Sequence, residues 1–200
     1  AIVDVLTGKA NPCGKLAETY PICLKDTPTS FRYPDSKEDV QYRESIFIGY
    51  RYYDKVERNV RFPFGFGLSY TSFEYSDIKL KKKNLTKGEG AKVTFTIKNT
   101  GDVAGAEIAQ VYVGKPESRV FRAPKELKGF VKVYLEPGEE KKVSVELDDR
   151  AFAFWNTATD GWCVESGEYN ILVGASSRDI RLEAAVKMKS EDDATIVDLR

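Results

Sequence analysis

The chain has 200 residues, of which 42% are hydrophobic and 31% are charged, and its 31 basic side chains balance its 31 acidic ones. This length suits one large or two small domains, and the hydrophobic content suffices for a buried core. Zero net charge argues against a nucleic-acid-binding protein, which usually carries a basic excess. Because the chain has no histidine, a histidine general base, a Ser-His-Asp triad and a histidine-ligated zinc site are excluded within it.

The three cysteines, Cys13, Cys23 and Cys163, are an odd number without a C-x-x-C spacing, which is typical of neither a disulfide framework nor a metal cluster. We expect free thiols, with a Cys13–Cys23 bridge as the alternative. No apolar run is long enough for a membrane span. We therefore expect no metal, no cofactor and neither a nucleic-acid nor a membrane partner.

The first part of the chain is predicted to hold little regular structure. Residues 1–8 place apolar side chains at positions 2, 3, 5 and 6 and end on Gly8, which predicts a short helix with a glycine stop. Residues 9–45 are polar and contain four prolines, so we expect a long irregular segment that lies across another folded body. Residues 46–53 are aromatic and β-branched, and are expected to be a strand or extended.

Residues 61–75 interleave aromatic side chains with one proline and two glycines. Proline and glycine break a helix and weaken a central strand. We therefore expect a pinned, extended segment that joins two folded bodies and buries its rings on one side with period two. In the chain on its own, exposure or contact with a second copy is expected for some of Phe62, Phe64, Phe66 and Tyr70.

From residue 73 onward, short strand-like runs alternate with turn signals. In one of them Val93, Phe95 and Ile97 fall on one face and polar side chains on the other, as in a half-buried strand. About eight such runs with even spacing and no helical segment predict a two-sheet antiparallel sandwich. The runs are 73–81, 91–99, 106–114, 128–136, 141–147, 167–175 and 180–188, with hairpin arms at 151–155 and 162–165 around Asp160-Gly161.

Charged side chains offer no clear catalytic pair. Two carboxylates would be the signature of a glycosidase, but Asp35, Glu38 and Asp39 fall in the irregular segment and Asp148-Asp149 follows a strand, so surface or turn roles are expected. Lys81-Lys82-Lys83 is the only basic run and is expected to protect the end of a strand. We therefore name no catalytic, substrate-binding or metal-binding residue.

Two further patterns have alternative interpretations. Tyr50, Tyr52 and Tyr53, together with the rings of residues 62–75, form either a platform for stacking sugars or part of an interdomain core. The interleaved proline and glycines favour the core, because they fix the backbone. Asn84-Leu-Thr86 matches the acceptor pattern for N-glycosylation, which is common by chance.

Seven longer motifs follow one another along most of the chain. Among them are Ile48-Gly-Tyr-Arg-Tyr-Tyr-Asp54, Phe62-Pro-Phe-Gly-Phe-Gly-Leu-Ser-Tyr-Thr-Ser-Phe73 and Gly167-Glu-Tyr-Asn-Ile-Leu-Val-Gly-Ala-Ser-Ser-Arg-Asp179. The others span residues 11–21, 99–113, 124–130 and 135–139. In type, order and spacing they resemble the C-terminal portion of glycoside hydrolase family 3, the β-glucosidase and β-xylosidase group, from about residue 1 to 185. Cys13 stands where the family more usually has a small residue such as serine.

The resemblance implies a parent enzyme with a (β/α)8-like barrel, an α/β sandwich domain and a fibronectin type III-like domain. It implies a mainly β chain, a fibronectin type III-like antiparallel β-sandwich preceded by a mostly irregular remnant of the α/β sandwich domain. The implied boundaries are 1–68 for the α/β tail plus linker, 69–190 for the fibronectin type III-like domain and 191–200 for a tail.

The resemblance also implies a function. Family enzymes have an Asp nucleophile in the barrel and often a Glu acid/base upstream of the Gly-Lys-Leu segment, and neither motif is present here. The chain is then an inactive packing module of an enzyme that hydrolyses terminal β-glycosidic bonds. Its partners are the barrel and α/β domains, with a carbohydrate substrate for the parent, and exposed linker aromatics offer a surface for self-association. The alternative is a carbohydrate- or protein-binding module with Tyr112 or Trp155 on an exposed face.

Overall fold

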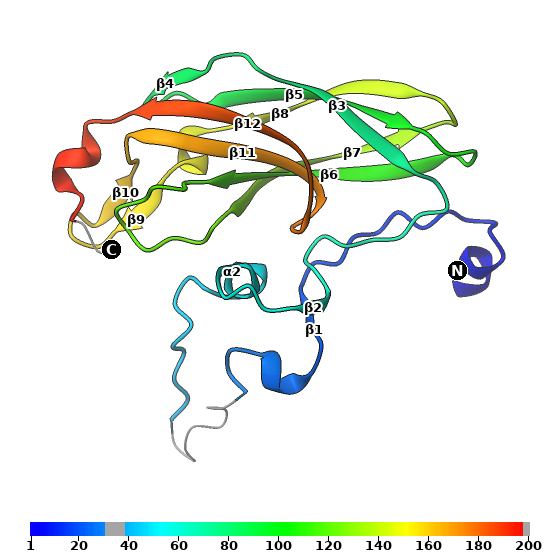
Figure 1. The fold of residues 1–200 in the computed structure, drawn as a ribbon, viewed down its shortest axis with the longest axis horizontal. Coiled ribbons are helices and arrows are strands. Elements are labelled where there is room, and N and C mark those ends of the chain that lie inside the picture. Colours follow the sequence, from blue (N-terminus) through cyan, green and yellow to red (C-terminus); the bar gives the residue numbers. More distant parts are fainter. Residues whose placement is uncertain (31–38, 198–200) are drawn as a thin grey trace.

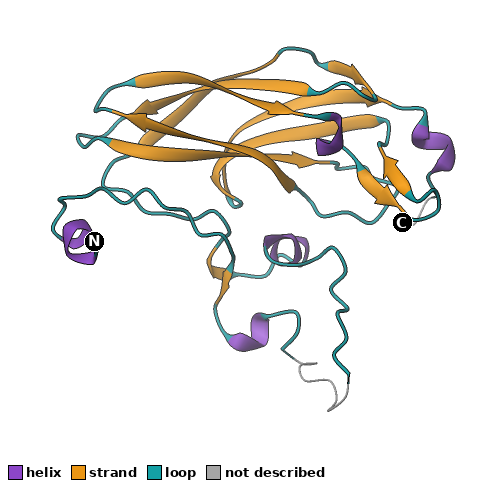
Figure 2. Ribbon diagram, turned by 180° about the vertical axis from the view of Figure 1, so that it is seen from behind, coloured by secondary structure: helices purple, strands orange, loops and turns teal. Residues whose placement is uncertain are grey.

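The computed structural model describes residues 1–30 and 39–197 (Figure 1). A β-sandwich forms most of it, and a segment with little regular structure lies beneath one of its sheets (Figures 1 and 2). We call residues 1–72 the linker segment and residues 73–189 the sandwich. The elements of the linker segment are α1 (Ile2–Leu6), β1 (Tyr20–Pro21), η1 (Leu24–Asp26), α2 (Tyr50–Lys55) and β2 (Val60–Phe62).

The sandwich contains two sheets and a hairpin, with one short 3-10 turn, η2, between strands. Its elements are β3 (Phe73–Leu80), β4 (Asn84–Thr86), β5 (Ala91–Asn99), β6 (Gly105–Gly114), β7 (Glu126–Leu135), β8 (Glu140–Leu147), η2 (Asp149–Ala151), β9 (Phe154–Asn156), β10 (Gly161–Cys163), β11 (Gly167–Ser176) and β12 (Asp179–Lys189). The sheet orders are β3-β5-β8 and β4-β12-β11-β6-β7, and β9 pairs with β10. All pairs are antiparallel except β4 with β12, which is parallel.

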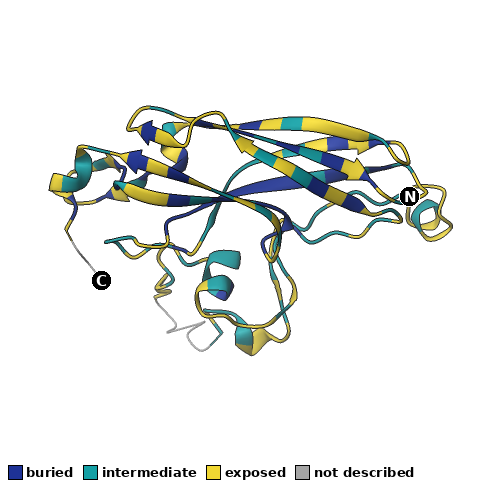
Figure 3. Ribbon diagram, turned by 45° about the horizontal axis from the view of Figure 1, so that its top comes forward, coloured by how far each residue is buried: buried dark blue, intermediate teal, exposed yellow. Residues whose placement is uncertain are grey.

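The predicted alternation in β5 is confirmed. Val93, Phe95 and Ile97 are fully buried between the two sheets, whereas Lys92 and Lys98 on the same strand are exposed. Burial of a side chain of this size contributes about 1.5–3 kcal/mol of hydrophobic free energy. Figure 3 shows that burial is concentrated in the strands of the sandwich, while the linker segment is mostly exposed or half-buried. The mainly β sandwich predicted from the sequence is therefore the fold of the chain.

The middle of the five-stranded sheet is buried on both faces. Val111 and Val113 of β6 point into the sandwich core, and Gln110 and Tyr112, on the opposite face of the same strand, are also buried. The second face is covered because α2 and the residues after β2 lie against it. When both faces of a sheet are covered, its inner strands are buried on both sides and lack the exposed polar face of a half-buried strand.

The expectation of a strand or extended chain over residues 46–53 is wrong, because α2 begins at Tyr50. Gly49 precedes the helix with a φ of 56°, a conformation that favours glycine. The helical turn places Tyr50, Tyr53 and Asp54 on one face, at spacings of three and four residues, and this face contacts the sandwich. Contacts with the sheet thus override the β propensity of the aromatic residues.

The expected exposure of the aromatic segment is confirmed. Phe62 is 38% exposed and Tyr70 50% exposed, and Phe64 and Phe66 are half-buried, so none of the four belongs to the sandwich core. Phe66 packs on Phe62 with ring centroids 5.0 Å apart, and Phe64 packs on Tyr50 at 4.9 Å. The segment lies on the outside of the sheet rather than inside the sandwich.

Several smaller expectations can be compared with the structure. The short helix before Gly8, which has a φ of 76°, is confirmed as α1. All three cysteines are free. Lys81, Lys82 and Lys83 are exposed directly after β3, an edge strand, as expected. Within the described ranges, none of the helices is long and apolar enough to cross a membrane.

The polar end of the chain is fastened to the sandwich as far as it is described. Residues 191–197 contain η3 (Asp192–Thr195), in which Asp192 accepts a hydrogen bond from the backbone N–H of Val164 at 2.9 Å. The Asp193 carboxylate accepts one from the backbone N–H of Ser166 at 3.0 Å and pairs with Arg119 at 2.9 Å. This short turn extends the sandwich at the end that holds the β9–β10 hairpin (Figure 1).

Candidate functional site

The contact between the linker segment and the five-stranded sheet, which we call the joint, is organised around Gly65. The Nε2 of Gln110 donates hydrogen bonds to the carbonyl oxygens of Gly65, at 3.1 Å, and Ala175, at 2.9 Å. The Tyr112 hydroxyl donates to the Oε1 of the same side chain. Gly65 has a φ of 80°, and a Cβ at this position would overlap the Gln110 amide. Only glycine allows this close approach of the backbone.

Tyr50 of α2 forms a second contact of the joint. Its hydroxyl accepts a hydrogen bond from the backbone N–H of Leu127 at 2.8 Å, and its ring lies edge-on to that of Tyr112 at 5.9 Å. Burial raises the pKa of both the Tyr50 and the Tyr112 hydroxyls, so both groups remain protonated at neutral pH. The rings and hydroxyls of the two tyrosines therefore hold α2 against β6 and the start of β7.

An ion-pair cluster forms the third contact. The largely buried carboxylate of Asp54 pairs with Lys125 at 2.8 Å and with the Nε of Arg178 at 3.0 Å. Arg178 also donates to the backbone carbonyls of Tyr53, at 3.2 Å, and Arg58, at 2.8 Å. Arg178 follows β11 and Lys125 precedes β7, so Asp54 fastens the end of α2 to two separate parts of the sandwich.

The remainder of the linker segment is fastened near the start of β6. Lys15 pairs with the buried carboxylate of Glu107 at 2.9 Å. The side-chain amide of Asn11 donates to the Ala104 carbonyl at 2.9 Å, and its oxygen accepts from the Tyr70 backbone N–H at 2.8 Å. The polar side chains of the joint thus bond to other parts of this chain, an arrangement suited to fixing the orientation of the two regions rather than to converting a ligand.

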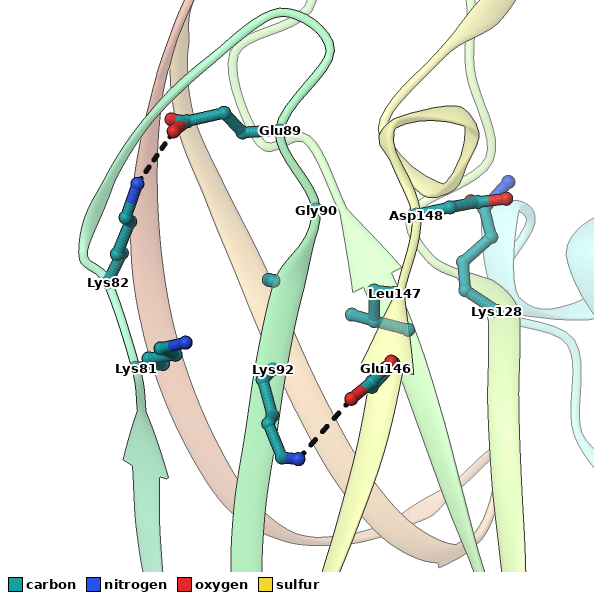
Figure 4. A pocket seen from close by; sticks show the side chains of 10 residues that line it. Lys81, Lys82, Glu89, Gly90, Lys92, Lys128, Glu146, Leu147 and Asp148 are labelled. Carbon is teal, nitrogen blue, oxygen red and sulfur yellow. Dashed lines mark hydrogen bonds and ion pairs between the residues drawn. The ribbon is translucent and has the colours of Figure 1, made fainter.

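A hollow at the end of the three-stranded sheet gathers charged side chains without forming a catalytic pair (Figure 4). Glu89 pairs with Lys82 at 2.6 Å, and this hydrogen bond lowers the pKa of Glu89 to about 2. Glu146 pairs with Lys92 at 3.3 Å. Figure 4 shows the two carboxylates at separate places in the hollow, each directed toward its own lysine. A glycosidase requires two carboxyl groups that face one bond, and this hollow does not provide them.

The acidic residues weighed from the sequence have the following places. Asp35 and Glu38 lie outside the described residues. Asp39 is exposed in the linker segment. The Asp148 side chain accepts a hydrogen bond from the Ala151 backbone N–H at 3.0 Å, and Asp149 lies in the η2 turn that this contact caps. The turn role expected for Asp148-Asp149 is confirmed.

Tyr112 and Trp155, the two aromatic residues proposed to lie on an exposed binding face, differ in burial. Tyr112 is fully buried beneath the linker segment, so the expectation that it lies on an exposed face is wrong. Outward-facing side chains of a sheet are exposed only where nothing covers the sheet, and α2 covers β6 here. Trp155 is 46% exposed and lies beside Trp162 on the β9–β10 hairpin.

Two family models match the chain in succession. The Glycosyl hydrolase family 3 C-terminal domain matches residues 1–70, and the Fibronectin type III-like domain matches residues 107–177. The chain is also 52% identical, over 95% of its length, to Thermostable beta-glucosidase B of Acetivibrio thermocellus. The chain belongs to glycoside hydrolase family 3.

Further relatives and solved structures agree with this assignment. The family 3 chain is 44% identical over 96% of its length to an Exo-alpha-(1->6)-L-arabinopyranosidase of Bifidobacterium longum. Its fold is similar to a GH3 beta-glucosidase of Bifidobacterium adolescentis (TM-score 0.88, 45% identity, 94% of this chain and 27% of that one). It is also similar to beta-glucosidase 3B of Thermotoga neapolitana (TM-score 0.85, 42% identity, 93% and 26%).

The family 3 chain spans only part of its relatives. It covers 25% of the length of the two curated relatives named above and about the same share of the two solved structures. It therefore corresponds to the C-terminal region of family 3 β-glucosidases, with the fibronectin type III-like domain included, and the remaining domains of those proteins lie outside it.

Sequence reasoning did not identify the residues of the joint. Asp54, Gly65, Gln110 and Arg178 all lie within the motifs that carry the family resemblance, but they are distant in sequence. Asp54 and Arg178 are 124 positions apart. Three residues depart from the residue types around them: Asp54 is an acid after a run of tyrosines, Gly65 lies between two phenylalanines, and Gln110 lies within an apolar strand. Such departures are expected where a contact with another region determines the residue, and they were the signal that the sequence offered.

Proposed function

We propose that this family 3 chain is the packing region of an enzyme that hydrolyses terminal β-glycosidic bonds, and that it supplies neither catalytic carboxylate. The relatives are named as glycosidases, and the region shared with this chain is about a quarter of each. In the proposed role, the joint sets the angle between the fibronectin type III-like domain and the α/β domain, to whose tail and linker residues 1–68 belong.

The observation that carries the proposal is the contrast between two sets of residues in the linker segment. Asp54 and Gly65 are fastened to the sandwich. Large apolar side chains elsewhere in the segment are exposed to solvent, among them Ile2, Leu6 and Leu68. Such a number of exposed large apolar side chains supports an interaction site, and the proposed occupant is the remainder of the α/β domain.

The proposed domain boundaries follow from this division. Residues 1–68 are the end of the α/β domain plus the linker, residues 69–190 the fibronectin type III-like domain, and residues 191–200 a tail. In the absence of the other domains, we propose that the chain self-associates through its exposed linker aromatics, Phe62 and Tyr70 among them. Sedimentation velocity at several concentrations tests this, and a Phe62→Ser, Tyr70→Ser variant should sediment as a monomer.

We propose that the choice of glycoside lies outside this chain. One relative is named as a β-glucosidase and another as an α-L-arabinopyranosidase. They are 52% and 44% identical to this chain, each over nearly the whole length of this chain. Relatives with such different names share this region, as expected of a part that packs domains and does not select the glycoside that the catalytic site hydrolyses. The carbohydrate is then a partner of the whole enzyme.

A chimera tests the proposal. The chain would replace the corresponding quarter of Thermostable beta-glucosidase B from Acetivibrio thermocellus, and hydrolysis of p-nitrophenyl β-glucoside would be measured. We expect the chimera to be active and the chain alone to be inactive. Turnover by the chain alone contradicts the absence of a catalytic pair. A folded chimera without activity contradicts the packing role.

A further inference from the structure

A hollow of about 640 Å³ lies at the end of the sandwich that carries the β9–β10 hairpin. Its lining is mostly apolar, and it comes from four parts of the chain: residues 45–51, residues 120–128, residues 153–162 with the hairpin, and residues 196–197. Ligand sites for small molecules typically measure about 300–1,000 Å³ and combine aromatic walls with a few polar groups. We call this hollow the tryptophan groove.

Two indole rings form one wall of the tryptophan groove. Trp155 and Trp162 are paired across the hairpin, with ring centroids 5.4 Å apart and planes at 77°. Cross-strand aromatic pairs stabilise a hairpin, and this accounts for the contact between the rings. The pairing does not explain why both rings stay exposed: 46% of the Trp155 surface and 45% of the Trp162 surface are accessible to solvent.

A third ring, that of Phe121, also lines the groove. Phe121 is exposed, and it is held by an edge contact with Phe47 at 5.1 Å and by Lys55 over its face at 4.9 Å. Large apolar rings from separate loops therefore surround one hollow. Scattered exposed hydrophobic residues are ordinary on a protein surface, but rings gathered around a concave site are typical of recognition.

The polar groups of the groove include both hydrogen-bond donors and acceptors. The donors are the cationic side chains of Arg51, Arg122 and Lys128, which line the hollow. Arg150, which does not line it, stacks on the face of Trp162 with its guanidinium carbon 4.0 Å from the ring centroid. Glu126 lies among Arg122, Lys128 and Arg51, at 3.4, 3.2 and 3.8 Å. Burial raises the pKa of Glu126, but Lys128 and Arg122 outweigh it, so the pKa is lowered and the side chain remains an acceptor.

Flat aromatic faces combined with donors and acceptors fit a neutral polyhydroxyl ring. A β-linked glucose unit has equatorial hydroxyls, so its C–H bonds point to both faces of the ring and its hydroxyls to the edge. The slightly positive C–H groups meet the negative face of an indole, and the hydroxyls meet the charged groups at the rim. We propose that the tryptophan groove binds β-linked glucan chains. This rests on the proposed function, since it places a polymeric form of that substrate class on the fibronectin type III-like domain.

The sequence provides a direct reporter for this proposal, because Trp155 and Trp162 are the only two tryptophans of the chain. Tryptophan fluorescence of the 200-residue chain would be followed during titration with cellohexaose and laminarihexaose, with maltohexaose as the α-linked comparison. We expect a saturable change at millimolar concentration with at least one β-linked hexaose, and weaker binding of maltohexaose. Absence of a saturable change with both β-linked hexaoses overturns the proposal.

Two variants identify the residues that bind. Trp155→Ala should weaken β-glucan binding by about tenfold or more, as removal of a central aromatic contact commonly does. Phe121→Ala should do the same without changing the hairpin, and so serves as a second variant if Trp155→Ala disturbs folding. Phe130→Ala is the matched control, because Phe130 is exposed on β7 but does not line the groove. Unchanged binding by Phe121→Ala overturns the proposal.

The groove could also be a protein interface, and self-association measurements distinguish this outcome from glucan binding. Self-association of the chain that Phe121→Ala abolishes, without any response to glucan, would identify the groove as a protein interface and overturn the proposal. The chimera described above separates this test from that of the packing role. In it, Phe130→Ala, which lies outside the groove, should leave hydrolysis of p-nitrophenyl β-glucoside unchanged. An active chimera with a groove that does not bind glucan would refute the groove alone.

Discussion

The sandwich and the linker segment are stabilised by different forces. In the sandwich, Phe95 and a large set of other apolar side chains are buried between two sheets. In the linker segment, Tyr53 is the only buried hydrophobic side chain among the described residues, and polar contacts through Asp54, Gly65 and Asn11 hold the chain in place. One region folds on its own core, whereas the other depends on a surface that the first provides. The two should therefore respond separately to substitution.

The largest effect is expected in the sandwich core. Phe95→Ala should lower the free energy of unfolding by roughly 3–5 kcal/mol, because it leaves a cavity where a fully buried ring packed. Denaturant unfolding followed by circular dichroism measures this loss. Phe130→Ala, at an exposed position, should change the same quantity by less than about 0.5 kcal/mol. A small effect of Phe95→Ala would contradict the idea that this core determines the stability of the chain.

A substitution at Gly65 should release the linker segment and leave the sandwich folded. Gly65→Ala combines a disfavoured positive φ with overlap on the Gln110 amide, and we expect a cost of roughly 2–3 kcal/mol on docking. Hydrogen exchange should accelerate in residues 60–72 but not in β5. Gly138→Ala is the matched control, because Gly138 has a φ of 76° and open space around it, so only the conformational cost of about 1 kcal/mol applies. Equal effects at the two glycines would rule out the proposed contact.

Removal of the charge on Asp54 should weaken the same attachment. Asp54→Asn leaves Lys125 and Arg178 facing each other without the anion between them, and we expect a loss of about 2 kcal/mol. Glu146→Gln removes a carboxylate from an exposed pair with Lys92 and should cost less than about 0.5 kcal/mol. Limited proteolysis of the linker segment, compared between the two variants, measures the difference. Identical digestion rates would show that the Asp54 cluster does not fasten α2.

The smallest effect is expected from the titration of Glu126, whose pKa is lowered in the folded chain by Lys128 and Arg122 against the effect of burial. Its stabilising contribution is complete above its ordinary pKa of 4.5 and is lost as the pH falls through the lower, folded-state value. The melting temperature of the wild type should therefore fall towards that of Glu126→Gln as the solution is acidified below about pH 4.5. A difference between the two that stays constant with pH would contradict this assignment.

The strands of the sandwich could be predicted from the sequence because the alternation of apolar and polar residues is a local pattern. Val93, Phe95 and Ile97 alternate with polar side chains, and the same pattern yields most of the strands. The three-residue strand β4 was missed, since Asn84-Leu-Thr86 is too short to show alternation. Tyr112 was misplaced because an alternating pattern shows which residues share a face, but does not show that a second region covers that face.

The linker segment and the candidate site could be predicted only in part. The Pro- and Gly-interrupted aromatics correctly indicated an exposed segment outside the sandwich core, but α2 was missed because its helix is decided by contacts with β6 and β7. The ion pair of Asp54 with Arg178 joins positions 124 apart, a distance at which a single sequence carries no pairing signal. Family resemblance indicated the region to which the chain belongs, and the geometry was needed to show what its motif residues contact.

The contact of Gly65 with Gln110 also implies an order of events during folding. The Gln110 amide bridges Gly65 of the linker segment and Ala175 of β11, and it projects from β6, the neighbour of β11. The Gln110 amide is held in position to donate to the Gly65 carbonyl only after β6 and β11 have paired. These two strands are far apart in the sequence. Although residues 1–72 come first in the chain, they should acquire protection last, after the sheet that holds them has closed.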